Sequence, residues 1–260
     1  NFFHPLVHFL ILGVNGAFLT GDLFNVFVFF EVLLIASYSL LMHAGDKQNT
    51  RAALQYVILN LVGSSVFLIG LGILYGVLGT LNIADMTQKV ALLTGDDVYL
   101  AKAGGLLLLV VFALKAALLP LHLWLPNTYA SAKPVVAALF AIMTKVGVYA
   151  MLRVYTVIFG EQAGELEHMA QSWLWGLAIA TIVVGAIGVM AAQDLRKLTA
   201  NLVVVSVGTL VALIALQNVT ATAALLYYLV HSTLVSAALF LLADLIATQR
   251  GKVGDRLVAG

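Results

Sequence analysis

Cysteine is absent from the 260 residues, and charged side chains make up only 10% of them. The lack of thiols excludes disulfides, cysteine-held iron–sulfur clusters and thiolate zinc sites. No pair of histidines suited to haem stands out either. The 13 basic and 12 acidic residues nearly cancel, which leaves a formal net charge of +1. We therefore expect no nucleic-acid partner, because binding of nucleic acid depends on a strongly basic surface.

Apolar residues are correspondingly abundant in the sequence. They form 62% of the chain, against about 45–50% in a typical soluble domain, and the mean hydropathy is +1.05. The apolar runs have the length of membrane helices, not of barrel strands. The sequence therefore predicts an all-α, polytopic transmembrane helix bundle in a lipid bilayer. It begins at Asn1 with no signal-peptide pattern, and we expect it to be a segment of a longer protein.

Eight apolar runs predict eight membrane crossings within one domain, residues 1–260. The runs are 4–20, 22–43, 51–78, 103–119, 134–158, 173–192, 198–216 and 221–248. The polar stretch 80–102 is the longest loop and has room for a short interfacial helix. Residues 160–172 form an acidic loop.

An even number of crossings places both chain ends on one side, and the basic residues favour that side. Its loops carry Lys47, Arg51, Lys133, Arg196, Lys197, Arg250, Lys252 and Arg256, whereas the opposite loops carry Lys89, Lys102 and Arg153. Basic loops stay in the cytoplasm during insertion. Both ends are therefore predicted to face the cytoplasm.

Four ionisable residues fall well inside predicted spans: Glu31, Lys115, Lys145 and His231. A charge at the bilayer centre costs roughly 2.5–3.5 kcal/mol on insertion scales, and such residues are functional-site candidates by default. Glu31 lies roughly 13 Å into its span at 1.5 Å per residue, too deep for easy access to the interface. Acids and bases at that depth can pair, and a purely structural ion pair is the alternative interpretation.

The stretch ALKAALLPLHLWLP, residues 113–126, predicts a broken helix near Pro120. Proline has no N–H, so the carbonyl of Ala116 would lose its helical partner beside Lys115. Broken helices at membrane depth line cavities or ion sites in transporters. His122 lies within the break as a possible accessory group, although a simple proline kink with a core histidine is also consistent with the pattern.

Hydroxyl and amide side chains also lie within the predicted spans. Asn60 and Ser64 are an i, i+4 pair on one helix face, and Thr144 precedes Lys145. Further members of this set are Asn201, Ser206, Ser232 and Thr233. Such residues usually serve helix packing in bilayers. As a set they are also suited to hold a file of water molecules between the charged centres.

These residues suggest a proton-transfer switch. Burial disfavours the charged forms of Glu31, Lys115 and Lys145, and a nearby opposite charge restores them. If Lys115 approaches Glu31, the glutamate stays ionised; if Lys115 turns toward Lys145, the glutamate is free to take a proton. His231 suits a relay toward the rest of the protein, since histidine titrates near neutral pH.

Four segments resemble the antiporter-like membrane subunits. This family joins the proton-pumping subunits of respiratory complex I to the Mrp-type multisubunit Na+/H+ antiporters. The segments are NGAFLTGDLFNVFVFFEVLLIASYSLL (15–41), FALKAALLPLHLWLPNTYASAKPVVAALFAIMTKVGVYAMLRVY (112–155), AAQDLRKLTANLVVVSVGTL (191–210) and LVHSTLVSAALFLLADLI (229–246). The wording around Glu31 is more similar to the D-type subunits of Mrp antiporters than to complex I.

The resemblance implies roles by position. Glu31 corresponds to the family's membrane glutamate and Lys115 to the lysine of its broken helix. Lys145 corresponds to the next lysine of the proton path, and His231 to the histidine that links two half-channels. The family fold has fourteen helices with two inverted repeats. The chain would hold the first repeat, about 1–160, and part of the second, about 170–260.

The resemblance also implies a function. The leading hypothesis is a proton-translocating subunit of a monovalent cation (Na+ or K+)/H+ antiporter, a secondary transporter and not an enzyme. It would work with other subunits in the bacterial cytoplasmic (inner) membrane. The alternatives are a proton-pumping subunit of a complex I-type NADH:quinone oxidoreductase or membrane-bound hydrogenase, and a scaffold that only anchors partners. None of these functions requires a cofactor or metal bound to this chain.

Overall fold

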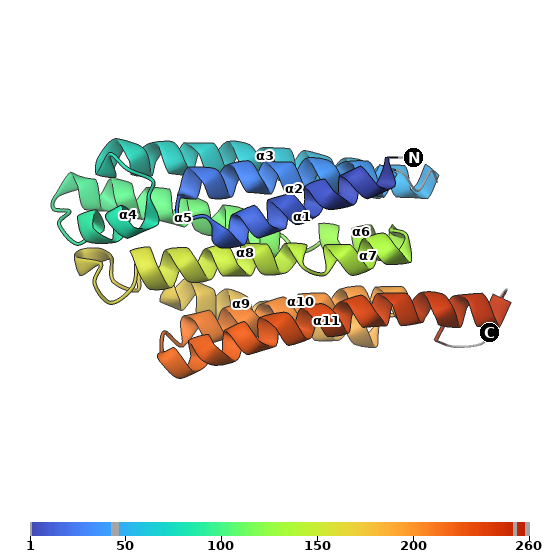
Figure 1. The fold of residues 1–260 in the computed structure, drawn as a ribbon. Coiled ribbons are helices and arrows are strands. Elements are labelled where there is room, and N and C mark those ends of the chain that lie inside the picture. Colours follow the sequence, from blue (N-terminus) through green and yellow to red (C-terminus); the bar gives the residue numbers. More distant parts are fainter. Residues whose placement is uncertain (1, 43–46, 252–253, 258–260) are drawn as a thin grey trace.

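The computed structural model describes residues 2–42, 47–251 and 254–257, without the side chains of 47–52. This part of the chain is all-helical, as predicted (Figure 1). Its helices are α1 (Phe3–Leu19), α2 (Leu23–Met42), α3 (Lys47–Leu78), α4 (Ile83–Val90), α5 (Asp96–Ala116), α6 (Trp124–Ser131), α7 (Pro134–Phe140), α8 (Met143–Leu152), a π-helix (Arg153–Ile158), a 3-10 turn (Gly164–Leu166), α9 (Gln171–Met190), α10 (Leu195–Ala215) and α11 (Val219–Arg250). Two isolated bridges, Asp22 with Asn82 and Asp194 with Arg256, are its only β-type pairings.

Seven segments of the described residues are long and apolar enough to cross a membrane, which confirms a multi-pass helical protein. They match seven of the eight predicted spans. The predicted span 4–20 corresponds to α1, an apolar helix of 17 residues. This length is at the lower limit for a crossing, because about 17–25 residues span the hydrocarbon core.

The predicted span 134–158 is not one regular helix. It comprises α7, a turn at residues 141–142, α8 and the π-helix, and it still counts as one 25-residue apolar segment. Pro134 at the first position of α7 suits a helix start, because its missing N–H would have no partner there. Hydropathy reports only that the segment is apolar, so it could not predict these irregularities.

The long loop 80–102 is shorter than predicted. It contains the short helix α4, in which Ile83, Met86 and Val90 are buried, and Asn82 caps its first turn. α5 then begins at Asp96, several residues before the predicted start at 103. Gly95 precedes it with a positive φ of 62°, a conformation in which glycine carries no steric penalty.

The helices run along one common direction, and both chain ends lie at the same end of the bundle (Figure 1). α1 packs on α2, α3 on α5, and α9 on α10. α8 lies between these groups and contacts both α5 and α10. The arrangement agrees with the predicted even number of crossings. Among the basic residues used for the orientation, Lys252 and the side chains of Lys47 and Arg51 lie outside the described residues.

Candidate functional site

A buried lysine lies in the last turn of α5. Lys115 is 5% exposed, and its Nζ donates to Asn60 Oδ1 at 3.3 Å and to Ser64 Oγ at 3.5 Å. Nζ also lies 5.9 Å from the centroid of the Phe30 ring, within cation–π range. Two neutral oxygens and an aromatic face therefore surround this ammonium group. Asn60 and Ser64 lie on one face of α3, as their i, i+4 spacing predicted.

Glu31 on α2 is joined to this lysine through Ser64. The Ser64 hydroxyl donates to Glu31 Oε1, and it also lies 2.9 Å from the backbone oxygen of Asn60. In the described part of the chain no salt bridge links Glu31 directly to Lys115. The structure thus brings the predicted pair together with a hydroxyl between them. We name this arrangement the Glu31–Ser64–Lys115 chain.

The orientation of Asn60 is fixed by the preceding turn of α3. Its Nδ2 donates to the backbone oxygen of Tyr56 at 2.8 Å, which turns Oδ1 toward Lys115. Tyr56 is fully buried, shares a 2.9 Å hydrogen bond with Ser37, and stacks on Trp124 with ring centroids 5.0 Å apart. A hollow of about 10 Å³ lies between Asn60 and Lys115, and that is roughly the space of one water molecule.

The end of α5 positions Lys115 at an irregular point of the backbone. α5 ends because Ala117 has a left-handed backbone, with φ 61°. The N–H of Leu118 then reaches the oxygen of Ala113 at 2.8 Å, a pattern typical of helix ends. The helix therefore ends before Pro120, whereas the sequence predicted a break caused by the proline.

Two contacts hold this helix end in place. The indole Nε1 of Trp124, at the start of α6, donates to the oxygen of Leu114 at 3.1 Å. On the other side, Gly147 of α8 approaches so closely that a Cβ atom there would lie 2.9 Å from the backbone nitrogen of Ala116. Only glycine allows this approach. α8, which carries Lys145, is thereby packed against the end of α5.

Lys145 has no exposed surface, and its Nζ donates to Ser206 Oγ on α10 at 3.0 Å. The salt bridges of the described residues do not include Lys145. It therefore does not share a hydrogen bond with the Glu31–Ser64–Lys115 chain. The neighbouring Thr144 is equally buried, and its hydroxyl has no hydrogen-bond partner among the described residues.

His122 and His231 lie in two different environments. His122 is 9% exposed in the turn between α5 and α6, and its buried Nδ1 lacks a partner within the described residues. His231 lies on the exposed outer face of α11, stacked against Tyr227 and Tyr228 with ring centroids 6.2 and 6.3 Å away. Among the described residues, neither histidine shares a hydrogen bond with Glu31 or Lys115.

Sequence reasoning missed the residues that position the site. Tyr56 orients Asn60 through its backbone, and the ring of Phe30 faces the ammonium of Lys115. Apolar and aromatic residues surround these positions in the sequence, so no local pattern distinguishes them. The i, i+4 relation of Tyr56 to Asn60 was the one available signal.

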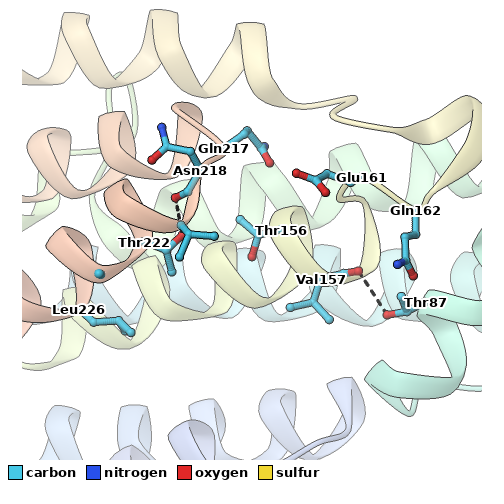
Figure 2. A pocket seen from close by; sticks show the side chains of 11 residues that line it. Thr87, Thr156, Val157, Glu161, Gln162, Gln217, Asn218, Thr222 and Leu226 are labelled. Carbon is cyan, nitrogen blue, oxygen red and sulfur yellow. Dashed lines mark hydrogen bonds between the residues drawn. The ribbon is translucent and has the colours of Figure 1, made fainter.

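An open pocket of about 600 Å³ lies at the end of the bundle opposite the chain ends (Figure 2). It is lined by Thr87, Thr156, Val157, Glu161, Gln162, Gln217, Asn218, Val219, Thr222, Ala223 and Leu226. Thr87 of α4 donates to the oxygen of Val157 at 3.3 Å across its edge. None of the predicted site residues lines this pocket.

Comparisons with known proteins agree with this architecture. Residues 20–256 match the family model described as "NADH:quinone oxidoreductase/Mrp antiporter, TM". A probable D-type subunit of a K(+)/H(+) antiporter from Rhizobium meliloti is 45% identical over 255 residues, which are 98% of this chain and 47% of that protein. The D-type subunit of the Na(+)/H(+) antiporter from Bacillus subtilis is 40% identical over 261 residues, covering 100% of this chain and 52% of that protein.

The solved structure of an Mrp complex from Dietzia sp. contains a similar chain. The TM-score is 0.81 at 36% identity, over 91% of this chain and 43% of that one. The chain spans about half the length of the curated relatives that it matches. The sequence, the helical bundle and these matches together show that the chain belongs to the NADH:quinone oxidoreductase/Mrp antiporter transmembrane family.

Proposed function

We propose that this chain is the proton-translocating part of a subunit of a multisubunit cation/H+ antiporter, with Na+ or K+ as the exchanged cation. The observation that carries the proposal is the Glu31–Ser64–Lys115 chain, an acid and a base linked by one hydroxyl inside an apolar bundle. The printed names of the relatives include both K(+)/H(+) and Na(+)/H(+) antiporter subunits, which supports this cation class.

A proton moves along the Glu31–Ser64–Lys115 chain in two coupled transfers. The ammonium of Lys115 gives a proton to the oxygen of Ser64, and Ser64 gives its own hydroxyl proton to the carboxylate of Glu31. The lysine becomes a neutral amine, the glutamate becomes a carboxylic acid, and the serine is unchanged. Hydroxyl groups accept and donate at once, so Ser64 is suited to this step. Both products are neutral, and the buried site favours neutral groups.

Lys145 is the next proton-carrying residue of the proposed path. The close approach of Gly147 to Ala116 holds its helix against the end of α5. Movement of Lys115 away from Ser64 would leave Glu31 without its nearby positive charge. Proton affinity at Glu31 would therefore depend on the position of one ammonium group, a coupling between two titrating sites. Thr144 and His122 are accessory groups in this proposal, and His231 continues the path.

The family resemblance supports a finer assignment of the fold. We assign α5 and α6 as the halves of a broken helix around Pro120, within a fold of fourteen helices. Residues 1–160 form the first inverted repeat, and residues 170–260 belong to the second. His231 then lies where further helices of a full-length chain cover α11. This agrees with the high cost of a lipid-exposed histidine at mid-membrane depth.

The proposed protein works in a bacterial cytoplasmic membrane with other membrane subunits as partners. The relatives come from Rhizobium meliloti and Bacillus subtilis, and the Dietzia chain belongs to an Mrp complex. A redox-driven proton pump is the second candidate function, because the matched family model also includes NADH:quinone oxidoreductase. In that case electron transfer in partner subunits would supply the energy.

Everted membrane vesicles separate the two candidates. The vesicles come from antiporter-deficient cells that express the full-length protein with its native partners. Respiration builds a pH gradient, a fluorescent dye reports it, and Na+ or K+ is then added. Collapse of the gradient by either cation supports the antiporter. If neither cation has an effect and the complex forms a gradient only with a redox substrate, the redox-pump function replaces it.

A scaffold function is tested in the same vesicles. Glu31→Ala is expected to abolish cation-dependent collapse while the complex assembles normally on native gels. Loss of assembly together with transport would instead favour a structural role of Glu31.

A further inference from the structure

A cavity of about 350 Å³ lies between the start of α1, the end of α2 and the start of α7. It is found at the end of the bundle that holds the chain ends (Figure 1), the side predicted to face the cytoplasm. Binding pockets for small molecules measure about 300–1,000 Å³, so this cavity is large enough to hold one. The residues of the proposed proton path do not line it.

The polar part of the cavity wall is basic. Lys133 supplies an ammonium group with three N–H donors, and the imidazole of His4 supplies a further hydrogen-bonding group. Both residues are exposed, so a molecule from the surroundings can reach them. The described residues that line the cavity include no acidic side chain. The wall therefore favours an anionic group in the occupant.

Lys133 differs from two other basic residues at this end of the bundle. Arg196 lies 3.1 Å from Asp244, and Lys197 lies 3.3 Å from Asp194, so carboxylates of the chain already neutralise both of them. The salt bridges within the described part of the chain do not include Lys133. Its ammonium group is therefore available to a ligand from outside the chain.

The rest of the cavity wall is apolar and includes Phe3, Leu40 and Val135. The ring of Phe3 packs edge-on against His4, with centroids 5.6 Å apart and planes at 79°. Val135 is 52% exposed, so the apolar wall continues onto the surface of the bundle. The wall therefore suits a molecule with both an anionic group and a hydrocarbon part. A phospholipid has both, whereas an inorganic anion has only the first.

We propose that this cavity binds an anionic phospholipid of the cytoplasmic leaflet. The lipid phosphate contacts Lys133 and His4, and the start of an acyl chain lies along Phe3, Leu40 and Val135. Seven helical segments are long and apolar enough to cross a membrane, so phospholipids surround the chain. Basic pockets between membrane helices on the cytoplasmic side are suited to anionic headgroups. The bound lipid joins α1, α2 and α7 at their ends, and this inference does not depend on proton transport.

Photo-crosslinking in the assembled complex tests the site. The full-length protein and its native partners are placed in nanodiscs of phosphatidylcholine that contain a photoactivatable phosphatidylglycerol below saturation. Mass spectrometry of peptides then locates the lipid adducts, which we expect on the peptides that carry Leu40 and Val135. Lys133→Gln removes the positive charge and should lower the adduct yield about fivefold, the factor that one basic residue near an anionic headgroup contributes.

Lys102→Gln is the matched control, because Lys102 is an exposed lysine near the start of α5, at the opposite end of the bundle (Figure 1). It should keep the wild-type yield, and Lys133→Arg should restore most of the yield because it keeps the charge. A photoactivatable phosphatidylcholine should label Lys133→Gln and wild type equally. Equal phosphatidylglycerol yields in Lys133→Gln and Lys102→Gln would overturn the proposal.

Other occupants of the cavity give different results. If inorganic phosphate at constant ionic strength removes the adducts, the site binds a free anion. If the same peptides carry no lipid and crosslink to another subunit, the cavity is a protein interface. Either result would overturn the proposal. The vesicle assay decides the proposed function separately, because lipid adducts form whether or not the complex exchanges cations for protons.

Discussion

Ser64 is the residue on which the proposed proton step depends most directly. Ser64→Ala removes the hydroxyl that contacts both charged groups, while Asn60 remains as an oxygen acceptor for Lys115. The ammonium keeps one of its two oxygen partners, so we expect the helices to pack as before. The carboxylate of Glu31 loses its donor, and the proton loses its bridge to the acid.

The magnitude follows from the hydrogen bonds that disappear. A hydrogen bond to a charged group contributes about 1.5–3 kcal/mol, which corresponds to a factor of roughly 10–150. The hollow of about 10 Å³ beside Lys115 is not lined by Ser64, so a water molecule held there would not occupy the position of the missing hydroxyl. We therefore expect Ser64→Ala to reduce the exchange rate by a factor of roughly 10–150.

The assay is the decay of the dye signal in everted vesicles after addition of Na+ or K+, normalised to assembled complex. Ser65→Ala is the matched control, because Ser65 is the next residue of α3, is exposed, and bonds only to the oxygen of Leu61 at 3.2 Å among the described residues. It should keep the wild-type rate. A Ser64→Ala rate equal to that of Ser65→Ala would refute the hydroxyl bridge.

Three further substitutions test the surroundings. Lys145→Met should abolish exchange without lowering the thermal stability of the complex, since burial of a charged group is costly and an apolar side chain of similar length avoids that cost; a large loss of stability would indicate a structural lysine. Trp124→Phe should keep the stacking but lose the bond to Leu114, at a cost of about 1–3 kcal/mol in unfolding free energy; unchanged stability in denaturant unfolding would contradict this. Gly147→Ala should separate α8 from α5, because its Cβ would lie 2.9 Å from the Ala116 nitrogen. This separation should slow exchange. A wild-type rate would show that the contact is dispensable.

Hydropathy predicted the membrane helices well because the length of an apolar run is a property of the sequence alone. The depth of Glu31 and Lys115 followed from the same runs, and both residues do lie close together around Ser64. The bridging hydroxyl was not predicted, because the contact depends on how α2, α3 and α5 rotate against one another. Rotation is set by packing, which single-helix patterns do not report.

The exposure of His231 also could not be predicted from the sequence pattern. Apolar residues surround α11 on all faces, so its periodicity does not indicate which face is buried. The structure places His231 on an exposed face of α11. The residue at which α5 ends could not be predicted either, because alanine rarely adopts the left-handed backbone that Ala117 has.

The proton-carrying role of Glu31 is the central claim, and one comparison tests it most directly. Glu31→Gln keeps the size and an oxygen acceptor for Ser64 but cannot take up a proton. Glu165→Gln makes the same change at an exposed residue of the loop before α9. We expect cation-driven collapse of the pH gradient to disappear in Glu31→Gln and to persist in Glu165→Gln, at equal levels of assembled complex. Wild-type exchange in Glu31→Gln would contradict the account.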